Sequence, residues 1–339
     1  MIDILQNYYP VMMLMVIIFF LGIILLRYYE PYAIKKDILA VPGSRTLHEN
    51  KIPRGGGIVF SLLFVFGIAI LFVFGITSFE VLMVLGVGGF VATIFGFADD
   101  IVDISEGYKL TVQILLAMWV IYWFEANILI ELVPSWFSLF LTSFLLVWMI
   151  NLYNFMDGID GMAISGALFI SIIASILSLV GGGLELSIIF FLLAVSSVGF
   201  IIYNWPPARI FMGDAGSIFL GYCFGALVLK SSTNGDISFW IWVIILSYFL
   251  VDTTVTLLLR IVIVRRYLPH RSHAYQNLAR IWNSHAKVTG LVMAYHFIWI
   301  LPLSVWATID NDVEIIAALL AIVPVILLTL KYGPIFSSA

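Results

Sequence analysis

Residues 10–26 read PVMMLMVIIFFLGIILL, a stretch without one charged side chain. A helix needs about 20 mostly apolar residues to cross the hydrocarbon core of a bilayer. Ten further runs of this kind follow along the chain. The eleven runs are residues 10–26, 57–75, 79–97, 110–124, 136–150, 163–180, 186–203, 214–230, 238–259, 288–309 and 313–330. Because several runs are short, the sequence predicts ten or eleven spans.

The composition of the whole chain supports this interpretation. Of 339 residues, 63% are hydrophobic and 11% are charged, against roughly a quarter charged in soluble domains. The runs are continuous rather than alternating, which favours helices. We therefore expect an all-α, polytopic transmembrane helical bundle that forms one domain over residues 1–339. A net charge of −4 argues against nucleic-acid binding, and the single cysteine, Cys223, excludes a disulfide within the chain.

Basic residues predict the orientation of the bundle, because Lys and Arg concentrate in cytoplasmic loops. With the N-terminus outside, all 16 basic residues except Lys230 fall in cytoplasmic loops. The two sizeable loops, 27–56 and 260–287, then face the cytoplasm. The first run has Asp3 and no basic residue before it, so we expect it to remain as a helix rather than act as a cleavable signal.

Polar residues cluster in four segments on this predicted cytoplasmic side. The segments are FADDIVD at 97–103, NLYNFMDGIDG at 151–161, FMGDAGS at 211–217 and PHRSHAYQ at 269–276. Carboxylates that share a site raise one another's pKa or require a cation, and Mg²⁺ typically binds one or two carboxylates together with substrate phosphates. The clusters therefore indicate phosphoryl chemistry.

A structural interpretation of the same residues remains open. Asp157, Asp160 and Asp214 are placed where each could cap a helix, Asp99 with Asp100 could form a solvated helix end, and the histidines could be ordinary loop residues. The occurrence of all four clusters on one side favours a site. Asp252 is different because it lies inside the ninth run. An acid within the membrane is usually paired or functional, and we expect it to pair with a basic residue of the following loop.

Five motifs in these regions resemble, in order, those of the polyprenyl-phosphate N-acetylhexosamine-1-phosphate transferases, glycosyltransferase family 4 (the WecA/MraY-like superfamily). They are PRGGG at 53–57, GFADD at 96–100, NFMDGIDG at 154–161, FMGDAGS at 211–217 and HRSH at 270–273. The resemblance covers about residues 40 to 290. It implies ten or eleven spans and cytoplasmic catalytic loops in a bacterial or archaeal plasma (inner) membrane, and it is compatible with a homodimer.

The resemblance also implies a reaction. A polyprenyl (undecaprenyl) phosphate in the bilayer attacks the β-phosphorus of a UDP-activated amino sugar, which yields the polyprenyl-diphospho-sugar and UMP. Mg²⁺ is required, with Mn²⁺ as a substitute. The donor sugar is an N-acetylhexosamine or a 6-deoxy-N-acetylhexosamine, and the reaction starts cell-surface glycan synthesis.

Residue roles follow from the resemblance, motif by motif. The implied catalytic residues are Asp99, Asp100, Asp157 and Asp160. The implied metal ligands are Asp214 and Asp100. The implied substrate-binding residues are Lys51, Arg54, Lys109, Asn154, His270, Arg271 and His273.

The last motif departs from one branch of the family. The muramoyl-pentapeptide translocases carry three consecutive histidines where this chain has His270-Arg271-Ser272-His273, so we expect a donor without a peptide, as in the branch that initiates O-antigen (lipopolysaccharide) and related glycans. Two alternatives to a transferase are a secondary transporter of an anionic lipid or sugar phosphate and a non-catalytic scaffold. A transporter would place polar groups near the midplane and show repeats.

Overall fold

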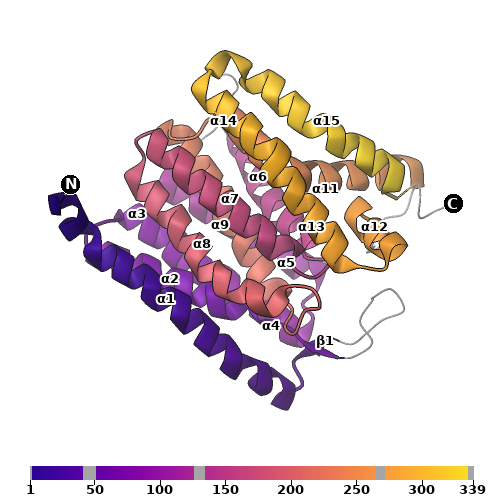
Figure 1. The fold of residues 1–339 in the computed structure, drawn as a ribbon, viewed down its shortest axis with the longest axis horizontal. Helices are drawn as coiled ribbons and strands as arrows, with labels where there is room; N and C mark the ends of the chain where they lie inside the picture. The colour runs from indigo at the N-terminus through magenta and orange to yellow at the C-terminus, as the bar shows by residue number, and fades with distance from the viewer. Residues whose placement is uncertain (1, 41–50, 126–133, 265–271, 335–339) are drawn as a thin grey trace.

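The computed structural model describes residues 2–40, 51–125, 134–264 and 272–334. They are almost entirely helical (Figure 1). The helical elements are α1 (Ile2–Lys35), α2 (Gly57–Val73), α3 (Phe79–Val81), η1 (Leu82–Gly88), α4 (Gly89–Val102), α5 (Glu106–Phe124), α6 (Ser135–Met156), α7 (Met162–Val180), α8 (Leu184–Asn204), α9 (Gly213–Asn234), α10 (Phe239–Ile245), α11 (Ser247–Leu259), η2 (Arg260–Val264), α12 (Ala274–Trp282), α13 (His285–Tyr295), η3 (His296–Ile300), α14 (Leu301–Ile309), η4 (Asn311–Val313) and α15 (Glu314–Tyr332). The predicted all-α fold is confirmed.

Each of the eleven predicted runs coincides largely with one of these helical elements or with two or three consecutive ones. Within the described residues, nine helices are long and apolar enough to cross a membrane. Helix α2 is apolar but shorter, at 17 residues. The ninth run, 238–259, differs from the expected continuous span because α10 and α11 meet at an angle of 78°. The backbone at Leu246, with φ −90° and ψ 0°, ends α10. No glycine or proline marks that position in the sequence.

Helix α9 lies at the centre of the bundle, and α1 and α15 lie along opposite edges (Figure 1). Glycines allow the neighbouring helices to come close to α9. A side chain at Gly57 of α2 would collide with the backbone of Gly216, and one at Gly96 of α4 would collide with the carbonyl group of Asp214. Small residues drive helix association in lipid, where the hydrophobic effect gives no help. This close approach brings the C-terminal end of α4 beside the start of α9.

A short antiparallel ribbon is the only strand pairing in the described residues. Strands β1 (Leu39–Ala40) and β2 (Ile52–Pro53) pair with Leu39 opposite Pro53. The chain then runs beside the segment before α9. Phe211 N donates to Pro53 O (2.8 Å), and Gly56 N donates to Phe211 O (3.0 Å). The first and fourth sequence motifs are thereby joined.

The loops that were predicted to share one side of the membrane do meet at one end of the bundle. Hydrogen bonds that join them run from Gly56 N to Phe211 O (3.0 Å), from Tyr275 Oη to Phe155 O (2.7 Å) and from Asn277 Nδ2 to Tyr332 O (2.6 Å). At the other end, Ser78 N donates to Glu185 Oε1 (2.8 Å), and Ser238 Oγ donates to Glu314 Oε2 (2.7 Å). The predicted alternation of loops is therefore confirmed, and which end faces the cytoplasm stays a prediction.

Candidate active site

Asp100 fixes the start of α9. Its Oδ1 accepts from Asp214 N (3.0 Å) and its Oδ2 accepts from Ala215 N (3.1 Å), and its side chain is only 3% exposed. Gly213, with φ +70°, precedes this turn, and a side chain there would collide with the Asp100 carboxylate. A carboxylate suits the positive end of a helix dipole. The metal-ligand role implied for Asp100 is therefore poorly supported by its geometry, which is that of a helix cap.

Arg54, expected to bind substrate, instead contacts the C-terminal end of α4. Its Nε donates to Asp100 O (2.7 Å) and its Nη2 donates to Asp99 O (3.1 Å). Its Nε also lies 3.6 Å from the Asp100 carboxylate. Cations are favoured at a helix C-terminus. The loop after β2 is thereby fastened to α4.

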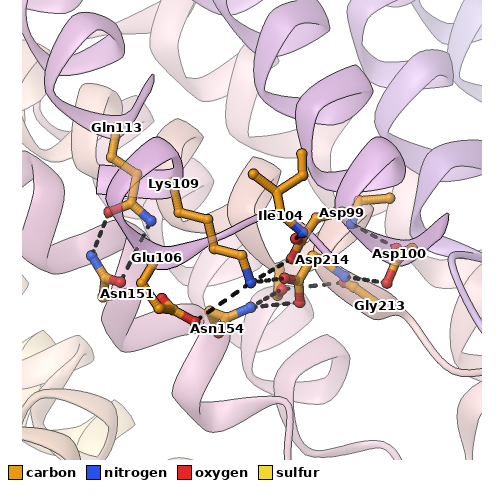
Figure 2. A network of polar contacts seen from close by, with 12 residues as sticks. Asp99, Asp100, Ile104, Glu106, Lys109, Gln113, Asn151, Asn154, Gly213 and Asp214 are labelled. Atoms are coloured by element: carbon orange, nitrogen blue, oxygen red, sulfur yellow. Dashed lines mark hydrogen bonds and ion pairs between the residues drawn. The ribbon is translucent and has the colours of Figure 1, made fainter. Parts of the chain in front are cut away.

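Asp99 and Lys109 form the tightest ion pair of this region. Lys109 Nζ, on the first turns of α5, lies 2.7 Å from Asp99 Oδ2, and Ile104 N donates to Asp99 Oδ1 (2.7 Å). Figure 2 shows the lysine reaching across to the two aspartates that come from α4 and α9. Both Asp99 oxygens are thus engaged, and Asp99 holds the Lys109 ammonium in place.

Asp214 completes the cluster from α9. Its Oδ2 lies 3.8 Å from Lys109 Nζ, and its Oδ1 accepts from Asn154 Nδ2 (2.8 Å). Asn154 Nδ2 also donates to Ser217 Oγ (3.0 Å). At 28% exposure, the Asp214 side chain is more open than that of Asp99 or Asp100. Asp214 is therefore the carboxylate of the cluster that a ligand reaches most readily.

Asp157 follows α6 and faces the same cluster. It is half-buried, and among the described residues its carboxylate has no hydrogen-bond or ion-pair partner. Desolvation by burial, with the negative charges of Asp214, Asp100 and Asp160, raises the pKa of Asp157 well above its usual range. Among the four expected catalytic aspartates, Asp157 is thus the one placed to accept a proton or bind a cation.

Asp160 lies outside the Lys109 cluster and joins three segments. Its Oδ2 accepts from Ala208 N (2.9 Å), and its Oδ1 lies 3.1 Å from His285 Nδ1 on α13. Thr289 Oγ1 donates to its carbonyl oxygen (2.9 Å). The buried carboxylate therefore connects the loop after α6 to the loop before α9 and to α13.

The prediction for Asp252 is confirmed. This fully buried residue of α11 lies 3.3 Å from His273 Nδ1 through its Oδ2, while its Oδ1 accepts from Ala274 N (3.0 Å) at the start of α12. His273 is itself buried between the rings of Phe155 and Tyr275. His273, expected to bind substrate, thus anchors α12. His270 and Arg271 lie outside the described residues.

Lys51 is exposed beside β2 and makes no ion pair within the described part of the chain.

Sequence reasoning did not select Gln113, Ser217 or His285, although they contact site residues or the helices that carry them. Gln113 carries a usable signal, since a polar residue inside an apolar run demands a partner. No comparable signal marked His285.

The residues present fit a magnesium ion only if the protein supplies part of its coordination shell. Over the described residues, no three His, Cys, Asp or Glu side chains gather into a site that would enclose a metal. Asp214 and the amide of Asn154 offer oxygen atoms, and Mg²⁺ commonly takes one or two protein ligands and completes its shell with phosphate and water. The site therefore suits a metal that arrives with a phosphorylated substrate.

Known proteins with similar sequences share this part of the chain. Residues 82–232 match the model of glycosyl transferase family 4, a range that includes Asp99, Lys109, Asn154 and Asp214. The probable undecaprenyl-phosphate N-acetylglucosaminyl 1-phosphate transferase of Bacillus subtilis is 29% identical over 279 residues, which cover 79% of this chain and 76% of the relative.

Two further relatives align over shorter stretches. The undecaprenyl-phosphate alpha-N-acetylglucosaminyl 1-phosphate transferase of Thermotoga maritima is 30% identical over 56% of each chain. The phospho-N-acetylmuramoyl-pentapeptide-transferase of Fervidobacterium nodosum is 32% identical over 57% of this chain and 63% of its own. The motifs, the helical bundle and these matches agree, and the chain is similar to glycosyl transferase family 4 over residues 82–232 and to undecaprenyl-phosphate sugar-1-phosphate transferases over a longer stretch.

Proposed function

We propose that this protein transfers a sugar 1-phosphate from a UDP-activated N-acetylhexosamine or 6-deoxy-N-acetylhexosamine to undecaprenyl phosphate and releases UMP. The observation that carries the proposal is Lys109, held 2.7 Å from Asp99 and 3.8 Å from Asp214 at one end of the bundle. The acceptor named for the Bacillus and Thermotoga relatives is undecaprenyl phosphate. A lipid acceptor requires a site at the membrane surface, where the helix ends meet.

The chemistry requires two anions to meet. An oxygen of the lipid phosphate forms a bond to the β-phosphorus of the donor, while the bond from that phosphorus to the bridging oxygen breaks and UMP leaves with the electron pair. A phosphate monoester has a second pKa of about 6, so the nucleophile is largely ionised at neutral pH. The protein must therefore supply positive charge and alignment more than a strong base. Lys109 supplies the charge, and Asp99 fixes where it stands.

We propose that Asp214 and the Asn154 amide oxygen hold Mg²⁺, or Mn²⁺, together with the donor diphosphate. When bound, the ion neutralises charge on the diphosphate and on the leaving group. Asp157 stands beside this position without a hydrogen bond to a described residue, which suits it to accept a proton from the lipid phosphate or to orient the nucleotide. Asp100 and Arg54 act indirectly, because their contacts set the positions of α9 and α4.

The orientation of the molecule is part of the proposal. The end that carries Lys109 faces the cytoplasm and the N-terminus lies outside, as the distribution of Lys and Arg favours. The protein is then a multi-pass protein of a bacterial or archaeal plasma membrane with access to cytoplasmic nucleotide sugars. Cysteine substitution at Ser105 and Ser284, which lie at the starts of α5 and α13, should allow labelling from the cytoplasmic side alone.

Purified protein with undecaprenyl phosphate, Mg²⁺ and a panel of UDP-N-acetyl sugars tests the proposal. We expect UMP and a lipid-linked diphospho-sugar in equal amounts for at least one donor. Flux of a sugar phosphate or lipid phosphate across vesicles without UMP release would support the transporter alternative instead. Omission of the lipid should abolish UMP release, which separates transfer from simple hydrolysis.

A further inference from the structure

A pair of side-chain amides joins α5 to α6 beneath the polar cluster. Asn151 Nδ2 donates to Gln113 Oε1 (2.8 Å), and Gln113 Nε2 returns a longer bond to Asn151 Oδ1 (3.4 Å). Gln113 is buried and Asn151 is half-buried. Figure 2 shows the two side chains facing each other from the same helices that carry Lys109 and Asn154. Neither amide was assigned a role by the sequence motifs.

The position of each amide along its helix connects the pair to the site. Gln113 follows Lys109 by four residues on α5, and Asn151 precedes Asn154 by three residues on α6. Residues at these spacings lie on the same face of a helix. The amide pair therefore lies one turn from Lys109 on one side and one turn from Asn154 on the other.

Few other polar contacts fix α5 in the described structure. Trp119 Nε1 donates to Met83 O (2.8 Å), and Ser143 Oγ lies 3.6 Å from Met118 Sδ. Both contacts lie further along α5, away from Lys109. Helices in lipid are held by close packing and by hydrogen bonds between them. Loss of the amide pair would therefore leave the ion pairs of Lys109 as the polar contacts that join the first turns of α5 to neighbouring elements.

We propose that Gln113 and Asn151 form a positioning clamp that holds Lys109 at its place between Asp99 and Asp214. The inference rests on the proposed function for its catalytic consequence. Amides suit this task because each is both donor and acceptor, so the pair satisfies itself. Asn151 Nδ2 gains a further acceptor in Val147 O (2.8 Å). A charged pair in the same place would add its own field to a cluster of aspartates that already share one lysine.

Lysine labelling, read by mass spectrometry on protein in detergent, tests the clamp without any need for transfer activity. The variants are Gln113→Leu, Asn151→Leu, their combination and the milder Gln113→Asn, which keeps an amide but shortens its reach. Ser143→Ala, at the other contact between α5 and α6, is the matched control. Lys230, whose ammonium lies 5.0 Å from the Phe124 ring at the far end of α5, serves as an internal reference.

We expect labelling of Lys109 to rise several-fold in the Leu variants and in Gln113→Asn, with Lys230 and the Ser143→Ala protein unchanged. The double variant should resemble either single variant, because either change alone already breaks the pair. Unchanged labelling of Lys109, or an equal rise at Lys230, would overturn the clamp. Where a Leu variant does not fold, Gln113→Asn decides.

The kinetic part of the test separates the clamp from the proposed function. With wild-type protein active, the clamp predicts that kcat falls by tenfold to about a hundredfold in each variant, as misplacement by about 1 Å can cost. The KM for the UDP-sugar should change less than kcat, since the variants leave in place the hydrogen bonds of Asn154 to Asp214 and Ser217 that set the proposed donor position. A higher KM at normal kcat would overturn the positioning role. A wild-type protein without transferase activity would refute the proposed function, while the labelling result would still decide the clamp.

Discussion

The two ends of the bundle use their acidic side chains in opposite ways. At the end away from the site, two acids accept hydrogen bonds from neutral donors: Glu185 accepts from Ser78 N (2.8 Å) and Glu314 accepts from Ser238 Oγ (2.7 Å). At the site end, the carboxylates of Asp99 and Asp214 are both drawn toward Lys109, with Asp157 close by. At the first end the carboxylates have separate hydrogen-bond donors, whereas at the site end several carboxylates lie close together around one lysine.

Concentrated charge is costly unless something offsets it. Carboxylates that share a site repel one another, and an opposite charge within about 4 to 6 Å relieves the repulsion. Lys109 is the ammonium within 4 Å of Asp99 and Asp214 in the described structure. The contrast indicates that the site end is arranged for a charged ligand, whereas the contacts of Glu185 and Glu314 at the opposite end fasten neighbouring helical elements.

The largest difference in UMP release should appear between Asp214→Asn, at the site end, and Glu185→Gln, at the opposite end. Asparagine keeps the shape of Asp214 and caps a helix about as well, but it removes the charge. We expect UMP release to fall about a hundredfold or more, on the scale of lost electrostatic groups in active sites. Glu185→Gln should keep activity within about twofold, since most surface changes are nearly neutral.

Steady-state UMP release at saturating and limiting Mg²⁺ measures both variants. Wild-type turnover by Asp214→Asn at limiting Mg²⁺ would refute the metal assignment. Equal losses in the two variants would mean that the two ends do not differ in the way proposed.

Lys109→Met changes the lysine at the start of α5, and Lys230→Met changes a lysine of α9 that packs against the far end of α5. Removal of Lys109 leaves Asp99 and Asp214 without their shared cation, and we expect the catalytic efficiency to fall by tenfold to about a hundredfold. Lys109→Arg should recover part of it, because the charge returns with a different shape. Lys230→Met removes a cation–π contact to Phe124 and a positive charge near Glu80 and Asp236, all away from the site, and should leave kcat/KM unchanged. Loss of activity in Lys230→Met of the same size would contradict the comparison.

Sequence reasoning predicted the fold, and it also predicted that several of the acidic motifs share one end of the bundle; two independent signals carried these predictions. The apolar runs predicted where the helices lie, and the distribution of Lys and Arg predicted which loops lie at the same end of the bundle. Asp99 and Asp214, which are far apart in the chain, meet at Lys109 as a result, and Asp157 lies within electrostatic reach of Asp214. The alternation of loops was sufficient for this, because a helix of fixed length must return the chain to the other side.

The roles of individual residues were harder to predict, since they depend on geometry that spacing does not reveal. Asp99 and Asp100 are adjacent, yet successive helical residues point in directions about 100° apart. Asp99 therefore reaches Lys109, while Asp100 reaches the N–H groups of α9. His273 was expected at the donor and lies instead against Asp252. The motif identified the loop, but it could not say which way each side chain turns.

His273→Ala tests whether that loop binds the donor through His273 or only anchors α12. The change leaves the fully buried Asp252 carboxylate without its imidazole partner. The carboxylate keeps its hydrogen bonds from Ala274 N and Thr329 Oγ1, so we expect a loss of about 1 to 3 kcal/mol, as for a buried polar group that loses a partner, and a lower unfolding temperature. Asp252→Asn combined with His273→Ala should recover part of the loss. The KM of the folded protein for the donor should stay within a few-fold, and a strong rise in that KM would return His273 to the donor site.

The smallest expected effect concerns pH and compares Asp157→Asn with Asp236→Asn at the opposite end. Burial raises the pKa of both carboxyls, and at Asp157 the charges of Asp214, Asp100 and Asp160 add to it. Below about pH 3.9, the ordinary pKa of Asp, both folded and unfolded chains hold the proton. As the pH rises, the unfolded chain ionises first, so the protonated group contributes less and less to stability. This loss continues until the pH reaches the pKa of the folded state, and it is complete above that pH.

Because asparagine cannot ionise, a variant that carries it does not lose this contribution to stability as the pH rises. The unfolding temperature of Asp157→Asn, relative to wild type, should therefore increase from pH 4 to pH 7 by a few degrees, on the scale of about 2 to 4 °C per kcal/mol for chains somewhat smaller than this one. Asp236→Asn should show a smaller increase, because no other carboxylate is among the causes of its shift. Thermal melts in detergent without divalent cations measure both. Equal slopes for the two variants would mean that burial alone, and not the crowding of aspartates, perturbs Asp157.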